Sequence, residues 1–268
     1  MKRFLILLYG TLNYLMFLGV YLYFIAFVGD FAAPKTVNSG AAASLPGALA
    51  INFLLISLFA VQHSVMARRG FKRWWIKIIP QSIERSTFVF ITNLILILLM
   101  WQWRPLPQVV WSVEHHIASA ILYSLFGAGF ALAVLSSFLI NHFELFGLQQ
   151  VYREWRQRAF TAPPFQTPWV YKIIRHPMQA GQILGLWAIP LMTAGHLVLA
   201  LGMTVYIFIG IYFEERDLVR NFGQRYLDYR KEVPKLIPVL KTAKIKRNDG
   251  EASPEKAVNT AKASEEAA

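Results

Sequence analysis

The chain has 268 residues, of which 56% are hydrophobic and 15% aromatic, while only 16% are charged. Soluble domains carry roughly 25% charged residues, so this composition excludes an ordinary water-soluble fold and favours a chain dissolved in lipid. The sequence contains no cysteine. Disulfides, thiolate metal sites and a cysteine nucleophile are therefore excluded, and we predict no metal site.

The formal net charge of +12 does not indicate a nucleic-acid partner, because no nucleic-acid-binding motif accompanies the basic residues. They gather instead beside apolar runs, which is typical of the cytoplasmic side of a membrane protein. We therefore expect a multi-pass membrane protein with cytoplasmic N- and C-termini. The basic groups are Lys2 and Arg3, then Arg68, Arg69, Lys72, Arg73 and Lys77, and then Arg153, Arg156, Arg158, Lys172 and Arg175.

Four apolar runs are long enough to cross about 30 Å of hydrocarbon as helices that rise 1.5 Å per residue. They cover residues 4–28, 45–66, 86–103 and 117–140. The first run is too long for the core of a signal peptide, although the Ala32-Ala33-Pro34 segment that follows it resembles a cleavage site. We expect an uncleaved anchor.

The next apolar stretch, residues 178–213, is too long for one span and contains Pro190 and a Thr193-Ala194-Gly195 break. It predicts a helical hairpin with halves 178–193 and 195–213, either as two short spans or as a re-entrant pair. The predicted fold class is thus all-α integral membrane, with four transmembrane helices, a C-terminal hairpin (five to six membrane segments) and short cytoplasmic helices. Residues 1–238 form a single predicted domain, and 239–268 a disordered cytoplasmic tail.

The Arg175-His176-Pro177 motif precedes the apolar hairpin, and proline suits the first turn of a helix. Free N–H groups at that helix start, beside Arg175, attract anions. A carboxylate, a lipid phosphate or simply a membrane-anchoring role all fit this motif.

Polar side chains at the ends of two spans are candidates for chemistry, because ionisable groups are costly to bury in a membrane. His63 lies near the end of the second span, where it can act as a base or bond to a neighbouring helix. Asn141, His142 and Glu144 follow the fourth span and can contact a ligand, or serve only as a cap and as interfacial polar groups.

The motifs of the C-terminal half, in order, resemble the isoprenylcysteine carboxyl methyltransferase and phospholipid methyltransferase superfamily. They are Arg175-His176-Pro177, Gly181, Glu214-Glu215, Phe222-Gly223, Tyr226, Tyr229 and Val233-Pro234. Motifs further upstream are similar to the bacterial methanethiol S-methyltransferases. They are Gln62-His63-Ser64, Glu84-Arg85-Ser86-Thr87, Trp101-Gln102-Trp103 and Asn141-His142-Phe143-Glu144.

This resemblance implies methyl transfer from S-adenosylmethionine to methanethiol, which gives dimethyl sulfide, with a cofactor-binding core over residues 171–238. It implies catalytic roles for His63 and His142, and acceptor contacts for Asn141 and Glu144. The residues expected to bind the cofactor are Arg175, His176, Gln179, Gly181, Glu214, Glu215, Tyr226 and Tyr229. A Rossmann glycine fingerprint is absent, so helix ends and loops must build that site.

The sequence departs from the superfamily pattern at one position, and two alternative functions remain open. The superfamily often has tyrosine two residues after the motif proline, where this chain has Gln179, which can donate hydrogen bonds but offers no aromatic face. The acceptor can also be larger and lipophilic, such as a prenylcysteine carboxylate or a phospholipid amine. A non-catalytic membrane protein similar to the NnrU type is the alternative from another class.

Overall fold

The computed structural model describes residues 1–41, 43–159 and 164–238. Five of the helices in these segments are long and apolar enough to cross a membrane, which confirms the predicted multi-pass helical fold. The predicted disordered tail lies outside the described residues. The long helices are α1 (Lys2–Gly29), α2 (Leu45–Met66), α4 (Glu84–Gln102, preceded by the 3-10 turn η1, Gln81–Ile83), α5 (His116–Ile140) and α9 (Ala194–Phe222).

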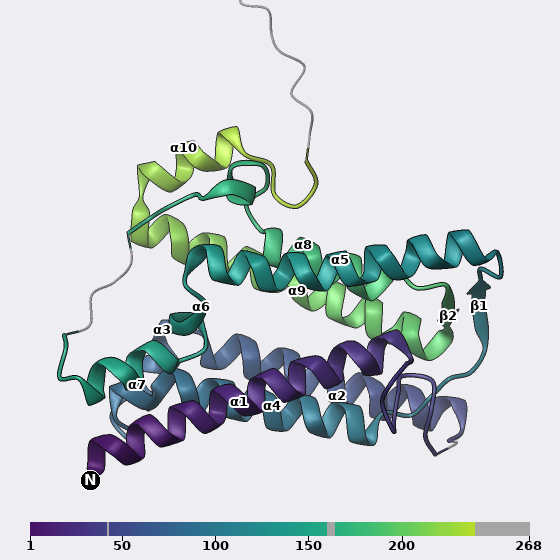
Figure 1. Ribbon diagram of the computed structural model, residues 1–268, viewed down its shortest axis with the longest axis horizontal. Helices are drawn as coiled ribbons and strands as arrows, with labels where there is room; N and C mark the ends of the chain where they lie inside the picture. The colour runs from purple at the N-terminus through teal and green to yellow at the C-terminus, as the bar shows by residue number, and fades with distance from the viewer. Residues whose placement is uncertain (42, 160–163, 239–268) are drawn as a thin grey trace, which may run out of the picture. The chain divides into compact units, whose positions relative to one another are not determined.

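The long helices run between two ends of the unit Met1–Ile237, and shorter elements gather at these ends (Figure 1). The N-terminus lies at the same end as α3, α7 and α10, which we call the basic end because Arg68, Arg69, Lys72 and Arg73 belong to it. A two-stranded ribbon marks the opposite end. The short helices are α3 (Arg69–Trp75), α6 (His142–Leu145), α7 (Leu148–Trp155), η2 (Trp169–Lys172), α8 (Pro177–Trp187) and α10 (Gln224–Glu232).

The first half of the predicted hairpin differs from the prediction. Helix α8 ends at Trp187, and the chain continues extended into β2 (Leu191–Thr193), which pairs antiparallel with β1 (Val109–Ser112). Pro190 cannot donate a helical hydrogen bond, and its carbonyl accepts one from the N–H of Val113 at 2.9 Å. The segment thus reaches the ribbon end before the chain turns at Thr193, which favours two short spans over a re-entrant pair, but it does so as a short helix plus a strand (Figure 1).

The second half of the hairpin is a longer helix than predicted. The Thr193 side chain accepts a hydrogen bond from the N–H of His196 and caps α9, which then continues for 29 residues. It ends only at Gly223, whose φ of 56° favours glycine. At 1.5 Å per residue α9 is about 43 Å long, so it exceeds the roughly 30 Å of hydrocarbon and carries its charged last turns beyond it.

Large apolar side chains face outward along the helices, as a lipid environment requires. On α2, for example, Phe53 is 72% exposed and Leu54 66% exposed. The buried faces are held together partly by small residues: Gly129 of α5 lies against Gly181 and Gly185 of α8, so the two backbones approach closely.

This glycine contact gives a stability prediction. A Cβ at Gly129 would lie 2.6 Å from the carbonyl oxygen of Gly181 and 2.6 Å from the nitrogen of Gly185, and backbone atoms cannot move aside as a side chain can. We expect Gly129→Val to lower the free energy of unfolding by at least about 1–3 kcal/mol, measured as a lower unfolding midpoint in detergent. Gly127→Val on the same helix is the control, because nothing lies within 4 Å of its Cβ position. Equal effects of the two variants would contradict the close approach.

Candidate active site

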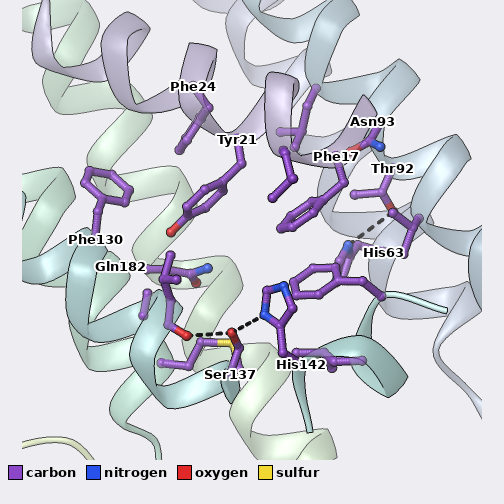
Figure 2. Close-up of a pocket in the computed structure, with 18 of the residues that line it drawn as sticks. Phe17, Tyr21, Phe24, His63, Thr92, Asn93, Phe130, Ser137, His142 and Gln182 are labelled. Atoms are coloured by element: carbon purple, nitrogen blue, oxygen red, sulfur yellow. Dashed lines mark hydrogen bonds between the residues drawn. The ribbon is translucent and has the colours of Figure 1, made fainter. Parts of the chain in front are cut away.

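A cavity of about 310 Å³ lies between α1, α2, α4, α5, α8 and α9, with α6 closing part of its wall (Figure 2). Its walls are mostly aromatic: Phe17, Tyr21 and Phe24 of α1 reach in from one side, and Phe130 lies across from them. Among the described residues that line it there is no carboxylate, and the one permanently charged side chain is Arg85. The other rings of the wall belong to Tyr14, Phe59, Phe88, Phe138, Phe146 and Tyr206, beside the imidazoles of His63 and His142.

His63 lies in this cavity, enclosed by the rings of Phe59, Phe88 and Tyr206. Its Nδ1 is 3.5 Å from Oγ1 of Thr92 (Figure 2). The single hydroxyl proton of Thr92 has a better acceptor in the carbonyl of Phe88, at 2.9 Å, so Oγ1 is left to accept the Nδ1–H of His63. The lone pair of His63 is then on Nε2, which has no hydrogen-bond partner within the described part of the chain.

His142 lines the same cavity, but both of its ring nitrogens are engaged. Ser137 Oγ donates to the carbonyl of Val134 at 2.6 Å and lies 2.7 Å from His142 Nδ1, so Nδ1–H donates to Ser137. The hydroxyl of Tyr14 then donates to Nε2 at 2.9 Å. Burial lowers the pKa of the His142 imidazole below its ordinary value. The arrangement keeps a neutral imidazole in one tautomer and one orientation.

A second cluster, the Arg175–Glu215 network, lies toward the basic end. The guanidinium of Arg175 contacts Glu215 Oε1 at 2.8 Å, and Nε2 of the buried His176 contacts the same oxygen at 3.1 Å. Gln179 donates from Nε2 to Glu214 Oε2 at 2.9 Å. The structure thus brings together five of the predicted cofactor residues, from the start of α8 and the last turns of α9.

Backbone hydrogen bonds tie this network to the segment after α10. The N–H groups of Arg175 and His176 donate to the carbonyls of Pro234 and Lys235, at 2.9 and 3.1 Å. The Arg175 guanidinium also donates to the carbonyls of Arg230 and Val233. Most of its donors are therefore used inside the protein, which makes it a poorer anion ligand than the sequence predicts.

The start of α8 retains free donors. No side chain caps this helix, and the N–H groups of Met178 and Gln179 have no acceptor among the described residues. The same helix reaches the cavity, because Met178 and Gln182 line it, as Tyr206 of α9 does. Tyr206 precedes Glu214 by eight residues, about 12 Å along the helix, so the network and the cavity are built on the same two helices.

The other three predicted cofactor residues form no hydrogen bond with the side chains of this network, although Tyr226 and Tyr229 lie near Arg175. Gly181 faces Gly129 in the α5–α8 contact, which gives it a packing role. Tyr226 is buried with an unpartnered hydroxyl, and Tyr229 donates to the carbonyl of Tyr171 at 2.5 Å. Burial raises the pKa of Tyr229 to about 12. Neither tyrosine lines the cavity, and both pack beside Phe165.

The two predicted acceptor residues line a separate polar cleft of about 640 Å³ at the basic end. Asn141 donates there to Glu144. Burial raises the pKa of the Glu144 carboxyl above its ordinary value, against the opposing effects of Arg153, Arg85 and Asn141. Contact of either residue with an acceptor inside the cavity is not supported by this placement, and their acceptor role stays a prediction.

Sequence reasoning missed several polar residues of the cavity wall, among them Arg85, Asn93, Gln182 and Tyr206. Asn93 is fully buried and its Nδ2 has no partner in the described structure. An amide in the middle of an apolar run is itself a signal, because lipid does not tolerate it without a partner. The other three give no such signal, since each is ordinary at a span end or on a helix surface.

Comparison with known proteins places this architecture. The phospholipid methyltransferase family model matches residues 124–225. A methanethiol S-methyltransferase of Mycobacterium tuberculosis is 49% identical over 89% of this chain and 98% of that protein. The chain belongs to the methanethiol S-methyltransferase family. This confirms the resemblance inferred from its motifs.

Other members of the family are similar over almost the same length. Methanethiol S-methyltransferase 2 of Bradyrhizobium diazoefficiens is 47% identical over 89% of this chain and 92% of that protein. The methanethiol S-methyltransferase of Crocosphaera subtropica is 43% identical over 90% of this chain and 94% of that protein. No solved structure matches the chain. Membership makes this protein a multi-pass membrane methyltransferase.

Proposed function

We propose that this methyltransferase transfers the methyl group of S-adenosylmethionine to methanethiol and releases dimethyl sulfide. The observation that carries the proposal is the aromatic cavity, which joins a small apolar space to a histidine with a free Nε2. At about 310 Å³ it is at the lower end of the size range of ligand pockets, which favours a small acceptor over a prenyl or phospholipid chain. The names of the relatives support the same acceptor.

The residues at the basic end fit S-adenosylmethionine, which supplies, when bound, an electrophilic methyl group on a positively charged sulfur. The half-exposed carboxylate of Glu214 can accept hydrogen bonds from an ammonium or from ribose hydroxyls. The free N–H groups at the start of α8 suit a carboxylate. Gln179 holds Glu214 in place, and the aromatic walls beyond it favour a sulfonium through cation–π attraction.

His63 is the proposed base. A thiol with a pKa of about 8.5 or above is mostly protonated at neutral pH, and only the thiolate is a good nucleophile. Nε2 of His63 takes the S–H proton, and the resulting thiolate would accept the methyl group that S-adenosylmethionine supplies when bound. The cavity wall orients the thiolate, and positioning of this kind supplies much of the acceleration. His142 forms a fixed part of the cavity wall, because Tyr14 and Ser137 hold its ring in one orientation.

We further propose that the basic end faces the cytoplasm of a bacterial cell and that the helices cross its inner membrane. The positive-inside bias supports this orientation, since the basic groups following α2 lie with the N-terminus and α10 at that end (Figure 1). A donor dissolved in the cytoplasm then reaches the Arg175–Glu215 network directly.

The test is methyl transfer by the purified protein from labelled S-adenosylmethionine to a panel of acceptors: methanethiol, a prenylcysteine and a phospholipid amine. We expect a labelled volatile product with methanethiol and none with the two lipids. Transfer to lipid alone would overturn the acceptor assignment. No transfer to any acceptor, with no heat of binding of S-adenosylhomocysteine in calorimetry, would favour the non-catalytic alternative.

A further inference from the structure

Arg85 occupies an unusual place, because it lines both the aromatic cavity and the polar cleft at the basic end. Leu145 is the one other residue shared by the described linings of the two spaces. The pair therefore forms the boundary between a polar space and an apolar one. Any small molecule that passes between the two spaces at this point passes the guanidinium.

The side chain of Arg85 is fixed in a way that leaves its terminal donors free. Its Nε–H donates to the carbonyl of Leu145 at 2.5 Å, and its guanidinium carbon lies 4.7 Å from the centre of the Phe88 ring. No carboxylate within the described residues forms an ion pair with it, and its two terminal nitrogens have no hydrogen-bond partner there. A fixed, planar cation with free N–H groups is a ready anion site.

Two carboxylates act on the charge of Arg85 without forming an ion pair with it. Glu84 is its neighbour on α4, and Glu144 on α6 is engaged with Asn141. His63 contacts the edge of the same Phe88 ring whose face Arg85 covers, with ring centres 4.7 Å apart. The remaining charged and titratable groups that line the two spaces are His142 on α6, Lys72 on α3, Arg153 and Glu154 on α7, Arg158 after α7, and the cavity tyrosines Tyr14, Tyr21 and Tyr206.

We infer that Arg85 binds the sulfur of the acceptor as a thiolate at this boundary. This inference rests on the proposed function and deepens it: the acceptor class is a small alkanethiol held as its anion. An apolar cavity disfavours a thiolate, and Arg85 is the permanent charge in its described lining that compensates. His63 and Arg85, which both contact the Phe88 ring, divide the task, because one takes the proton and the other holds the anion.

The test compares the pH dependence of kcat, at saturating S-adenosylmethionine and methanethiol, in the wild type, Arg85→Gln, Arg85→Lys and the control Arg156→Gln, because kcat reports the ionisation of the bound thiol. Arg156 also lies over an aromatic ring, Trp155, but faces solvent outside the cavity. An adjacent cation lowers the pKa of an acid by roughly 1–3 units. In Arg85→Gln we therefore expect the rise of kcat with pH to move up by about one unit or more, with at least a tenfold loss of kcat at pH 7.

The other variants and one binding measurement complete the test. Arg85→Lys keeps the positive charge, so its rate should rise at nearly the same pH as that of the wild type. Arg156→Gln should match the wild type at every pH. S-Adenosylhomocysteine should bind all four proteins with the same affinity, which shows that they are folded. Superimposable profiles for wild type and Arg85→Gln would overturn the inference while leaving the proposed function intact, as would equal losses in the Gln and Lys variants. A wild type that does not methylate methanethiol would overturn both.

Discussion

Replacement of His63 by alanine should lower turnover at neutral pH by roughly 10²- to 10⁴-fold, the usual contribution of a general base. The loss should be greatest at low pH, where the acceptor in solution is almost entirely protonated. It should shrink as the pH approaches the pKa of the thiol, because the thiolate then forms without a base. Binding of S-adenosylhomocysteine should be unchanged, since the Arg175–Glu215 network does not include His63. The measurement is single-turnover methyl transfer across pH, combined with calorimetry.

The matched control for this prediction is His116→Ala. His116 is exposed at the start of α5, stacked on His115 at the ribbon end and away from the cavity. Its removal should leave the rate within about twofold of wild type. If His63→Ala retains the wild-type rate at every pH, His63 has no part in proton transfer. The base must then be sought elsewhere in the cavity wall, with the hydroxyl of Tyr206 as the next group to test.

Glu215→Ala should have the largest effect on both stability and donor binding. The side chains of Glu215 and Arg175 are only 11% and 8% exposed, so the variant leaves a buried guanidinium without its counter-charge. Removing one partner of such a buried pair costs about 3–5 kcal/mol. Unfolding in detergent should shift accordingly, and S-adenosylhomocysteine should no longer bind measurably, because Arg175 and His176 lose their shared partner.

Asp228→Asn provides the comparison, since it breaks an ion pair with Lys231 whose side chains are 54% and 73% exposed. Exposed pairs contribute little to stability, so this variant should keep nearly wild-type stability and binding. A Glu215→Ala protein as stable as Asp228→Asn would show that the Arg175–Glu215 pair does not hold this region together. A stable Glu215→Ala protein that still binds the ligand would remove the network from the donor site.

The four single spans were predictable because capping or charged residues next to each apolar run mark where the helix begins and ends. Helix α2 covers the predicted residues 45–66, where Ser44 caps the start and Arg68 and Arg69 follow the end. The β1–β2 ribbon was not predictable in the same way. Its strands are three and four residues long and lie about 80 positions apart, so only the folded chain brings the extended segment beside Val109. Pro190 indicates a break in the helix, but not what replaces it.

The candidate site, too, was predictable only in part. The Arg-His-Pro motif and the paired glutamates were recognisable, and the structure brings Arg175, His176, Glu214 and Glu215 together. His63 and His142 meet in one cavity, but the sequence could not show that His142 is held at both nitrogens. In the sequence alone, Arg85 is one more basic residue before an apolar run. Its free donors, and its position between two spaces, exist only in three dimensions.

The length of α9 has a consequence for how the enzyme works in different membranes. Tyr206 of the cavity and Glu214, which lies beside the Arg175–Glu215 network, belong to one continuous helix of 29 residues. A long helix can adjust to a thinner or thicker bilayer by changing its tilt as a whole. The separation between Tyr206 and Glu214 is therefore set by the protein backbone and not by lipid thickness, so we expect the proposed donor and acceptor sites to keep their spacing when the lipid composition changes.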